Sequence, residues 1–199
     1  MNPNDPPVPI FELYRTDARL AIIDFFINEA NRDETYRMGE LVEQIDFSRE
    51  SLLKSLYSRN GPEQLVLLGV VDIEDLGAQI PHYSTADTPV VDFLTEYDGY
   101  PLEKLCGNPS VRKLTHFFLD QAKIGKAYNG SKIQEVTELG HYAFKDHIDR
   151  LVESSIIVEN DDEWYTQYQF NQDSDVFEDI ETLNELLYQE HKMRMKQIT

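Results

Sequence analysis

The sequence has few of the features that mark a secreted, membrane-bound or disulfide-stabilised protein. Its 199 residues include a single cysteine, Cys106, which excludes an intramolecular disulfide and suits a reducing cytoplasmic interior. No apolar run approaches the roughly 20 residues that a membrane-spanning helix needs. The first residues, MNPNDPPVPIF, carry neither the basic region nor the apolar core of a secretory signal, and their prolines predict a flexible arm over residues 1–14. We therefore expect a cytoplasmic protein with no membrane partner.

Motifs for metal binding and catalysis are also missing. Five histidines stand at positions 82, 116, 141, 147 and 191, and none of them is paired at ligand spacing. The acidic run Asp161-Asp162-Glu163 lacks the glycine and the spacing of a calcium loop. There is no glycine-rich phosphate loop, no nucleophile elbow and no His-Glu metal motif. We expect no metal, no cofactor and no enzymatic activity.

Basic residues are scarce: 18 lysines and arginines face 37 acids, for a net charge of -19. Nucleic acids generally attract basic proteins, so this balance argues against a nucleic-acid partner. A salt-filled cytoplasm would change that argument, because it screens charges within a few ångström and favours acidic surfaces for solubility. The composition agrees with such a host in part, since nine lysines remain.

What the chain does have is a helix-turn-helix pattern from Asn129 to Val158. Asn129 is suited to cap a short helix, and Leu139-Gly140 fits a tight turn between two helices. Phe144, Ile148, Leu151 and Val152 then recur at the spacing of one helix face. A β-branched run, residues 156–158, follows as a strand.

The same pattern occurs earlier in the chain. At an offset of about 92 residues Tyr128 corresponds to Tyr36 and Phe144 to Leu52, and after a six-residue step the offset becomes about 86, which pairs Ile156-Ile157 with Val70-Val71. Two constant offsets separated by one step predict an internal duplication of a small domain.

Each copy also predicts a strand, a loop and a returning strand after its helix pair, which together form a β-hairpin wing, and then a further helix. The expected fold is mainly α (α+β), with two tandem winged helix-turn-helix domains. We place the first domain at residues 15–106 and the second at 107–199, the second ending in a long C-terminal helix. That last helix is expected to join the two copies or to build a homodimer.

The first copy presents a candidate recognition helix that begins after Ser48. A helix held clear of its domain can enter the major groove, where its free face meets base edges and nearby basic residues meet phosphates. The angular plot assigns Ser51, Lys54 and Ser55 to that free face, with Arg49 and Arg59 near the two ends. From Phe47 to Asn60 the local charge is +2, a basic excess in an acidic chain.

The corresponding helix of the second copy is less basic. Its free face is expected to hold Tyr142, Ala143, Asp146, His147 and Arg150, with His141 and Lys145 nearby, and its local charge from Leu139 to Val152 is zero. Asp146 on this face would oppose phosphates unless it accepts a hydrogen bond from a cytosine amine. For both helices an ordinary solvated face is the alternative. Trp164, Tyr165, Tyr168 and Phe170 could stack bases, but their alternation favours a strand packed on its own domain.

The string from Ser48 to Leu56, SRESLLKSL, resembles the recognition helix of winged helix-turn-helix transcriptional regulators of the ArsR/MarR-like group. The segments near Tyr83 and Tyr168 resemble the junction between wing and last helix in haloarchaeal members and in haloarchaeal viruses and plasmids. The resemblance implies DNA reading by Ser48, Arg49, Ser51, Lys54 and Ser55, and by His141, Tyr142, Lys145 and His147. The wing tips differ from the family in carrying acids.

These observations predict a regulator, repressor-like, that binds double-stranded DNA through its helix-turn-helix units. The alternative is a protein–protein module, or a DNA mimic, that keeps the winged fold and presents its acidic surface to a basic partner.

Overall fold

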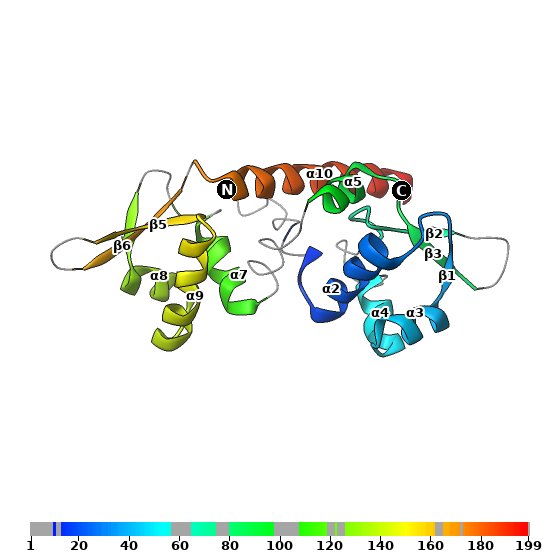
Figure 1. Ribbon diagram of the computed structural model, residues 1–199, viewed down its shortest axis with the longest axis horizontal. Helices are drawn as coiled ribbons and strands as arrows, with labels where there is room; N and C mark the ends of the chain where they lie inside the picture. Colours follow the sequence, from blue (N-terminus) through cyan, green and yellow to red (C-terminus); the bar gives the residue numbers. More distant parts are fainter. Residues whose placement is uncertain are drawn as a thin grey trace. The chain divides into compact units, whose positions relative to one another are not determined.

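The chain combines helices with two three-stranded antiparallel sheets, an α+β architecture (Figure 1). The computed structural model describes residue 10 and residues 13–56, 65–74, 80–97, 108–118, 122, 126–161, 165–171 and 173–198. Two compact units are present. The first unit comprises Pro6–Gly99 with Thr182–Thr199, and the second comprises Met1–Asp5 with Tyr100–Glu181. Most of the expected N-terminal arm and the expected boundary at 106/107 lie outside the described residues.

The first unit is built from a helical entry, a helix pair and a hairpin. Its elements in chain order are α2 (Asp17–Asp24), the π-helix η1 (Phe25–Glu29), β1 (Tyr36–Arg37), α3 (Met38–Ile45), α4 (Arg49–Leu56), β2 (Val71–Glu74), β3 (His82–Thr85) and α5 (Pro89–Glu96). Strand β3 lies between β1 and β2.

The second unit repeats this order. Its elements are α7 (Pro109–His116), β4 (Ala127–Asn129), α8 (Gly130–Thr137), α9 (His141–Glu153), β5 (Ile157–Asp161), β6 (Thr166–Phe170) and the start of α10 (Asp175–Ile198). Strand β6 lies between β4 and β5, so both sheets have the same topology.

Side-chain caps begin several of these helices where the sequence predicts them. The Asn129 side chain accepts a hydrogen bond from the Lys132 amide at 2.8 Å, and Ser48 accepts one from the Ser51 amide at 3.2 Å. Thr88 accepts from the Val91 amide at 3.3 Å, with Pro89 in the first turn of α5. Each cap satisfies an amide that has no partner within its own helix, and the predicted Asn129 cap is confirmed.

Matched backbone conformations occur at both offsets of the predicted repeat. Asp46 and Glu138, 92 residues apart, both end the first helix of a pair in the left-handed region, with φ of 54° and 57°. Gly69 and Ser155, 86 residues apart, have φ of 76° and 57°. These are rare conformations for residues other than glycine, so their recurrence at matched positions indicates one folding plan used twice.

The same aromatic cluster forms the core next to each sheet. The Phe25 ring lies 5.2 Å from Phe26 and 5.1 Å from Tyr36, edge to face in both cases. In the second unit the corresponding ring distances are 5.0 Å between Phe117 and Phe118 and 5.2 Å between Phe117 and Tyr128. Such edge-to-face pairs add to the stabilisation from burying the rings themselves.

Strands β1 and β4 were not expected from the sequence. Tyr36 pairs with Tyr83 of β3, and Tyr128 pairs with Tyr168 of β6, both antiparallel. Both strands are too short to show an alternating pattern, and they take strand geometry from the partner that they pair with.

The first helix differs from its predicted apolar stripe. The spacing predicts Leu20, Ile23, Ile27 and Ala30 as the inward face, with Phe26 beside them. Ile23 and Phe26 are buried as predicted, but Ile22 is also fully buried, and Leu20, Ile27 and Ala30 are only half-buried. For Ile27 and Ala30 the cause is the π-turn of η1, where the Ala30 amide donates to the Phe25 carbonyl at 2.8 Å. A wider turn shifts the following residues around the axis relative to a 3.6-residue repeat.

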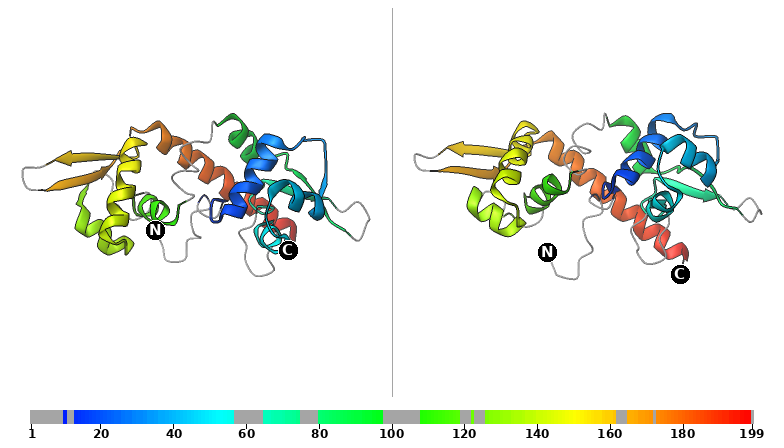
Figure 2. Two further views of the ribbon diagram at one scale, coloured as in Figure 1. Left: turned by 60° about the horizontal axis from the view of Figure 1, so that its bottom comes forward. Right: turned by 90° about the horizontal axis from the view of Figure 1, so that it is seen from below.

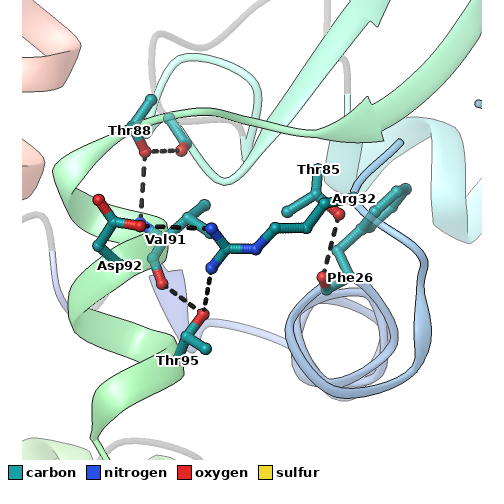
Figure 3. Close-up of polar contacts among 8 residues, drawn as sticks. Phe26, Arg32, Thr85, Thr88, Val91, Asp92 and Thr95 are labelled. Carbon is teal, nitrogen blue, oxygen red and sulfur yellow. Dashed lines mark hydrogen bonds and ion pairs between the residues drawn. The ribbon is translucent and has the colours of Figure 1, made fainter. Parts of the chain in front are cut away.

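A set of hydroxyl contacts ties α5 to the rest of the first unit (Figure 3). The Thr88 hydroxyl donates to the Gly69 carbonyl at 2.6 Å, and the Thr85 hydroxyl donates to the Phe26 carbonyl at 3.1 Å. Arg32 reaches across from the loop after η1 and donates to Asp92 at 3.4 Å and Thr95 at 3.0 Å. The junction between the hairpin and α5 is therefore fixed by polar as well as apolar contacts.

Helix α10 begins in the second unit and continues without a break into the first (Figure 2). The sequence predicts that the whole helix belongs to the second domain, whereas residues 182–198 pack within the first unit. There Leu183 and Leu187 are fully buried, and Arg194 donates to Glu190 and Asp72, both at 2.6 Å. None of the helices that the structure describes has the length and apolar character to cross a bilayer.

Candidate nucleic-acid interface

In the first unit, α3 and α4 meet at a tight turn that fixes the direction of α4. Asp46 ends α3 in the left-handed region, and two residues later Ser48 caps α4. The Ser48 and Ser51 hydroxyls also lie 2.9 Å apart, within hydrogen-bonding distance. Both predicted contact residues therefore form part of the cap, with Ser48 exposed and Ser51 half-buried.

The outer face of α4 carries an ion pair. Lys54 Nζ lies 2.6 Å from Glu50 Oε1, and the two side chains are 71% and 77% exposed. The hydrogen bond from Lys54, helped by its charge, lowers the pKa of Glu50, so this carboxyl is ionised near neutral pH. Arg49 is exposed at the start of the same helix, while Leu52 and Leu56 are fully buried on the opposite side. The helix is thus anchored by its leucines and presents its charged residues to solvent.

Ser55 is a correction to the predicted interface. The angular plot assigns it to the free face, but its side chain is only 5% exposed. Helix α4 packs against both α2 and α3, and the Leu65 amide returns to donate to the Ser55 carbonyl at 3.3 Å. A helix with neighbours on two sides buries a wider arc than its leucines alone indicate. Ser55 therefore contributes to the packing of α4 and not to its exposed face. Arg59, also predicted to contact DNA, lies outside the described residues.

The electrostatic balance of this surface is mixed. Within α4 two bases, Arg49 and Lys54, face one acid, Glu50. The adjoining surface of α3 and its C-cap exposes Glu40, Glu43 and Asp46. Any polyanion that approaches α4 would meet the basic residues only if it kept clear of α3.

In the second unit, α9 (His141–Glu153) is the counterpart of α4. Of the predicted residues His141, Tyr142, Lys145 and Arg150 are exposed, and Tyr142 reaches 83% exposure. The His141 and Tyr142 rings meet edge to face at 5.8 Å at the start of the helix. An exposed aromatic pair of this kind can meet a flat apolar surface such as a thymine methyl or a base edge.

His147 and the acids of α9 limit this surface. His147 is half-buried, and its Nδ1 is buried without a hydrogen-bond partner in the part of the chain that the structure describes. Asp146 and Asp149 are exposed on the same helix and offset Lys145 and Arg150. The candidate surface of α9 is therefore its N-terminal end, around the exposed Tyr142 and Lys145.

The aromatic side chains of β6 divide between core and surface. Tyr168 and Phe170 are 8% and 5% exposed, as their alternation predicts, and the Tyr168 ring lies 5.8 Å from Phe144. Tyr165 is 53% exposed, and Trp164 lies outside the described residues. A shallow cleft of about 400 Å³ opens beside Tyr165 and Tyr168. It is lined by Asn129, Gly130, Ser131, Gln134, His141, Phe144, Tyr165, Thr166 and Tyr168.

Two basic residues near the helix pairs were missed by the sequence reading. Arg37 precedes α3, where its amide donates to Glu40 at 2.6 Å and its guanidinium donates to His82 at 3.2 Å. Lys132 lies in the first turn of α8 and pairs with Glu135 at 2.9 Å. In the sequence repeat, the offset of 92 residues matches Arg37 to Asn129. This correspondence is the signal that could have drawn attention to Arg37.

Within the described ranges no group of three or more histidine, cysteine, aspartate or glutamate side chains is arranged to hold a metal ion. Comparisons of the chain with protein-family models, with curated proteins and with solved structures find no match.

Proposed function

We propose that this chain is a tandem winged helix-turn-helix protein that binds double-stranded DNA and regulates transcription, in the manner of a repressor. The observation that carries the proposal is the repeated arrangement of a capped helix pair followed by an antiparallel hairpin, with an exposed second helix in each copy. Protruding helices of this kind fit the major groove. Such a function places the protein in the cytoplasm.

The proposed mechanism assigns base contact and phosphate contact to different residues. Helix α4 enters the major groove with Ser48 and Ser51 at its leading end, and Arg49 and Lys54 neutralise phosphates. Lys54 exchanges its bond with Glu50 for a phosphate oxygen as the helix docks. In the second copy Tyr142 and Lys145 take the corresponding role, with His141 and Arg150 at the flanks.

The test is a mobility shift on the DNA upstream of its own gene. Lys54→Glu should weaken binding at least tenfold at about 100 mM salt, because it replaces a phosphate contact with a like charge. Lys113→Glu, an exposed residue of α7 with the same charge change, should bind like the wild type. Glu50→Gln should tighten binding several-fold by releasing Lys54. For all variants the affinity should fall as salt rises.

Two outcomes would count against the proposal. Equal shifts for the wild type and Lys54→Glu would remove α4 from the interface. No shift at any salt concentration would favour the second candidate, an acidic interaction module. That candidate is supported by the net charge of -19 and by the exposed acids of α3, and its ligand would be a basic protein.

A further inference from the structure

The outward side of α10 carries an ordered row of charges. At 100° per residue, Glu181, Glu185, Tyr188, Lys192 and Lys196 fall within an arc of roughly 80°. All five side chains are exposed, and Tyr188 is 40% exposed. The opposite side of the helix is buried, with Leu187 at 0% and Glu190 at 6% exposure. These residues therefore form one continuous stripe, which we call the outer stripe.

The charges of the outer stripe are segregated along the helix axis. Its N-terminal half holds the two glutamates and its C-terminal half holds the two lysines. The helix dipole favours acids in the first turn and bases in the last, but its influence fades within one turn. Glu185 and Lys192 both lie well inside this 24-residue helix, so the dipole does not account for them.

The segregation is symmetric about a point between Tyr188 and Gln189. Glu185 and Lys192 each lie about 5 Å along the axis from that point, and Glu181 and Lys196 each lie about 11 Å from it. An antiparallel copy of the same helix, placed on a two-fold axis through this point, would set every glutamate opposite a lysine. A parallel copy would instead oppose like charges.

We propose that the outer stripe of α10 is a self-docking surface on which a second copy of this chain packs its own α10 antiparallel. Two-fold symmetry makes the same surface serve both copies, so the dimer contains four Glu–Lys pairs, with one member of each pair from each helix. Tyr188, 40% exposed, lies next to the two-fold axis, so the Tyr188 side chains of the two copies meet at the centre. Glu185 also accepts a hydrogen bond from Gln189 at 2.6 Å, and a carboxylate can accept further donors.

The size and the charge of the outer stripe indicate a weak dimer. The stripe from Glu181 to Lys196 is about 24 Å long, which puts the interface at the small end of specific contacts. Exposed ion pairs contribute little individually and weaken as salt rises. Each copy also carries a net charge of -19, so the ion pairs act against repulsion between the copies, and the dissociation constant should be on the order of tens of micromolar at about 50 mM salt.

Charge reversal tests both the surface and its orientation. Sedimentation equilibrium at about 50 mM salt should show the wild type shifting from the 23.2 kDa chain mass towards twice that mass as concentration rises. Glu181→Lys with Glu185→Lys, and separately Lys192→Glu with Lys196→Glu, should each weaken self-association at least tenfold. A mixture of the two double variants should form a heterodimer, and the variant with all four changes should dimerise again.

The control carries the same charge change elsewhere: Glu43→Lys with Glu96→Lys, two exposed residues of α3 and α5, should dimerise at least as well as the wild type. A wild type that stays monomeric at about 200 µM would overturn the proposal. So would double variants that dimerise normally, or a fourfold variant that stays monomeric. None of these measurements involves DNA, so their failure is independent of the proposed function.

Discussion

Gly69 combines a left-handed backbone conformation with a close contact to a helix that is distant in the sequence. Its φ of 76° is unfavourable for any residue with a Cβ, and a Cβ built there would lie 2.2 Å from Cγ of the buried Glu190. Ser155, its counterpart in the second unit, tolerates a similar φ of 57°. The glycine is therefore required by the approach of α10 as much as by the turn.

Gly69→Ala should destabilise the first unit by about 2–4 kcal/mol, from the strained backbone and the forced displacement of Glu190. The measurement is the urea midpoint of unfolding. Gly39→Ala is the matched control, because Gly39 lies inside α3 and a Cβ there meets nothing within 4 Å. That change should stabilise the protein by about 0.5–1 kcal/mol. A Gly69→Ala midpoint equal to the wild type would mean that α10 is not held closely against this turn.

Single-residue predictions from the sequence succeeded where one local interaction decides the outcome. Asn129 caps a helix as predicted, because a short polar side chain before a helix has few better partners than the free amides. Ser55 was assigned to the wrong face because its burial depends on α2 and on a segment that returns from residue 65. No helical plot contains that information.

At the scale of elements, the sequence identified the longer units and missed those that form only by pairing. The helix pairs and hairpins follow from apolar periodicity and turn residues. Strands β1 and β4 contain two and three residues and exist because β3 and β6 offer them a partner edge. The π-turn of η1 was also missed. Its counterpart appears in the second unit, where the Ala122 amide donates to the Phe117 carbonyl at 2.7 Å.

The contact between α10 and β2 depends on one buried guanidinium. Arg194 is 16% exposed and donates to Glu190, to Asp72 and to the Val66 carbonyl, the last at 3.0 Å. Burial lowers the pKa of Arg194, but its bonds to Glu190 and Asp72 outweigh this effect and raise the pKa, so the side chain stays charged. The fork shape of arginine lets one side chain join a helix carboxylate to a strand carboxylate.

Replacing Arg194 with methionine should cost roughly 2–3 kcal/mol, because Glu190 and Asp72 would lose their shared cation in a partly buried site. Arg194→Lys should recover only part of the loss, since an ammonium cannot reproduce the fork. Urea unfolding at a protein concentration below dimer formation measures both. Lys192→Met, exposed on the same helix, should change stability by less than about 0.5 kcal/mol. An equal loss for both methionine variants would point to helix propensity rather than to this network.

For the whole molecule, duplication could be recognised from sequence because it leaves matched residues at constant offsets. Phe25, Phe26 and Tyr36 recur as Phe117, Phe118 and Tyr128 in the same edge-to-face cluster. The passage of α10 from one unit into the other could not be recognised, because an amphipathic helix does not specify which apolar surface will cover it. The sequence does differ at one matched position: the first copy has Gly69 where the second has Ser155, and Gly69 is where Glu190 of α10 packs closely.

The net charge of -19 should make folding and DNA binding respond to salt in opposite directions. Salt screens the mutual repulsion of the exposed acids, which opposes the compact state, so the thermal midpoint should rise by several degrees between about 0.05 and 1 M sodium chloride. Over the same range the proposed DNA complex should weaken steeply. A variant with Glu43, Glu96 and Glu153 changed to glutamine should show a smaller salt effect on the midpoint, because all three are exposed acids that contribute to the net negative charge. A midpoint that falls with salt would contradict this prediction. It would show that salt weakens attractive pairs such as Arg194–Asp72 more than it weakens the repulsion between acids.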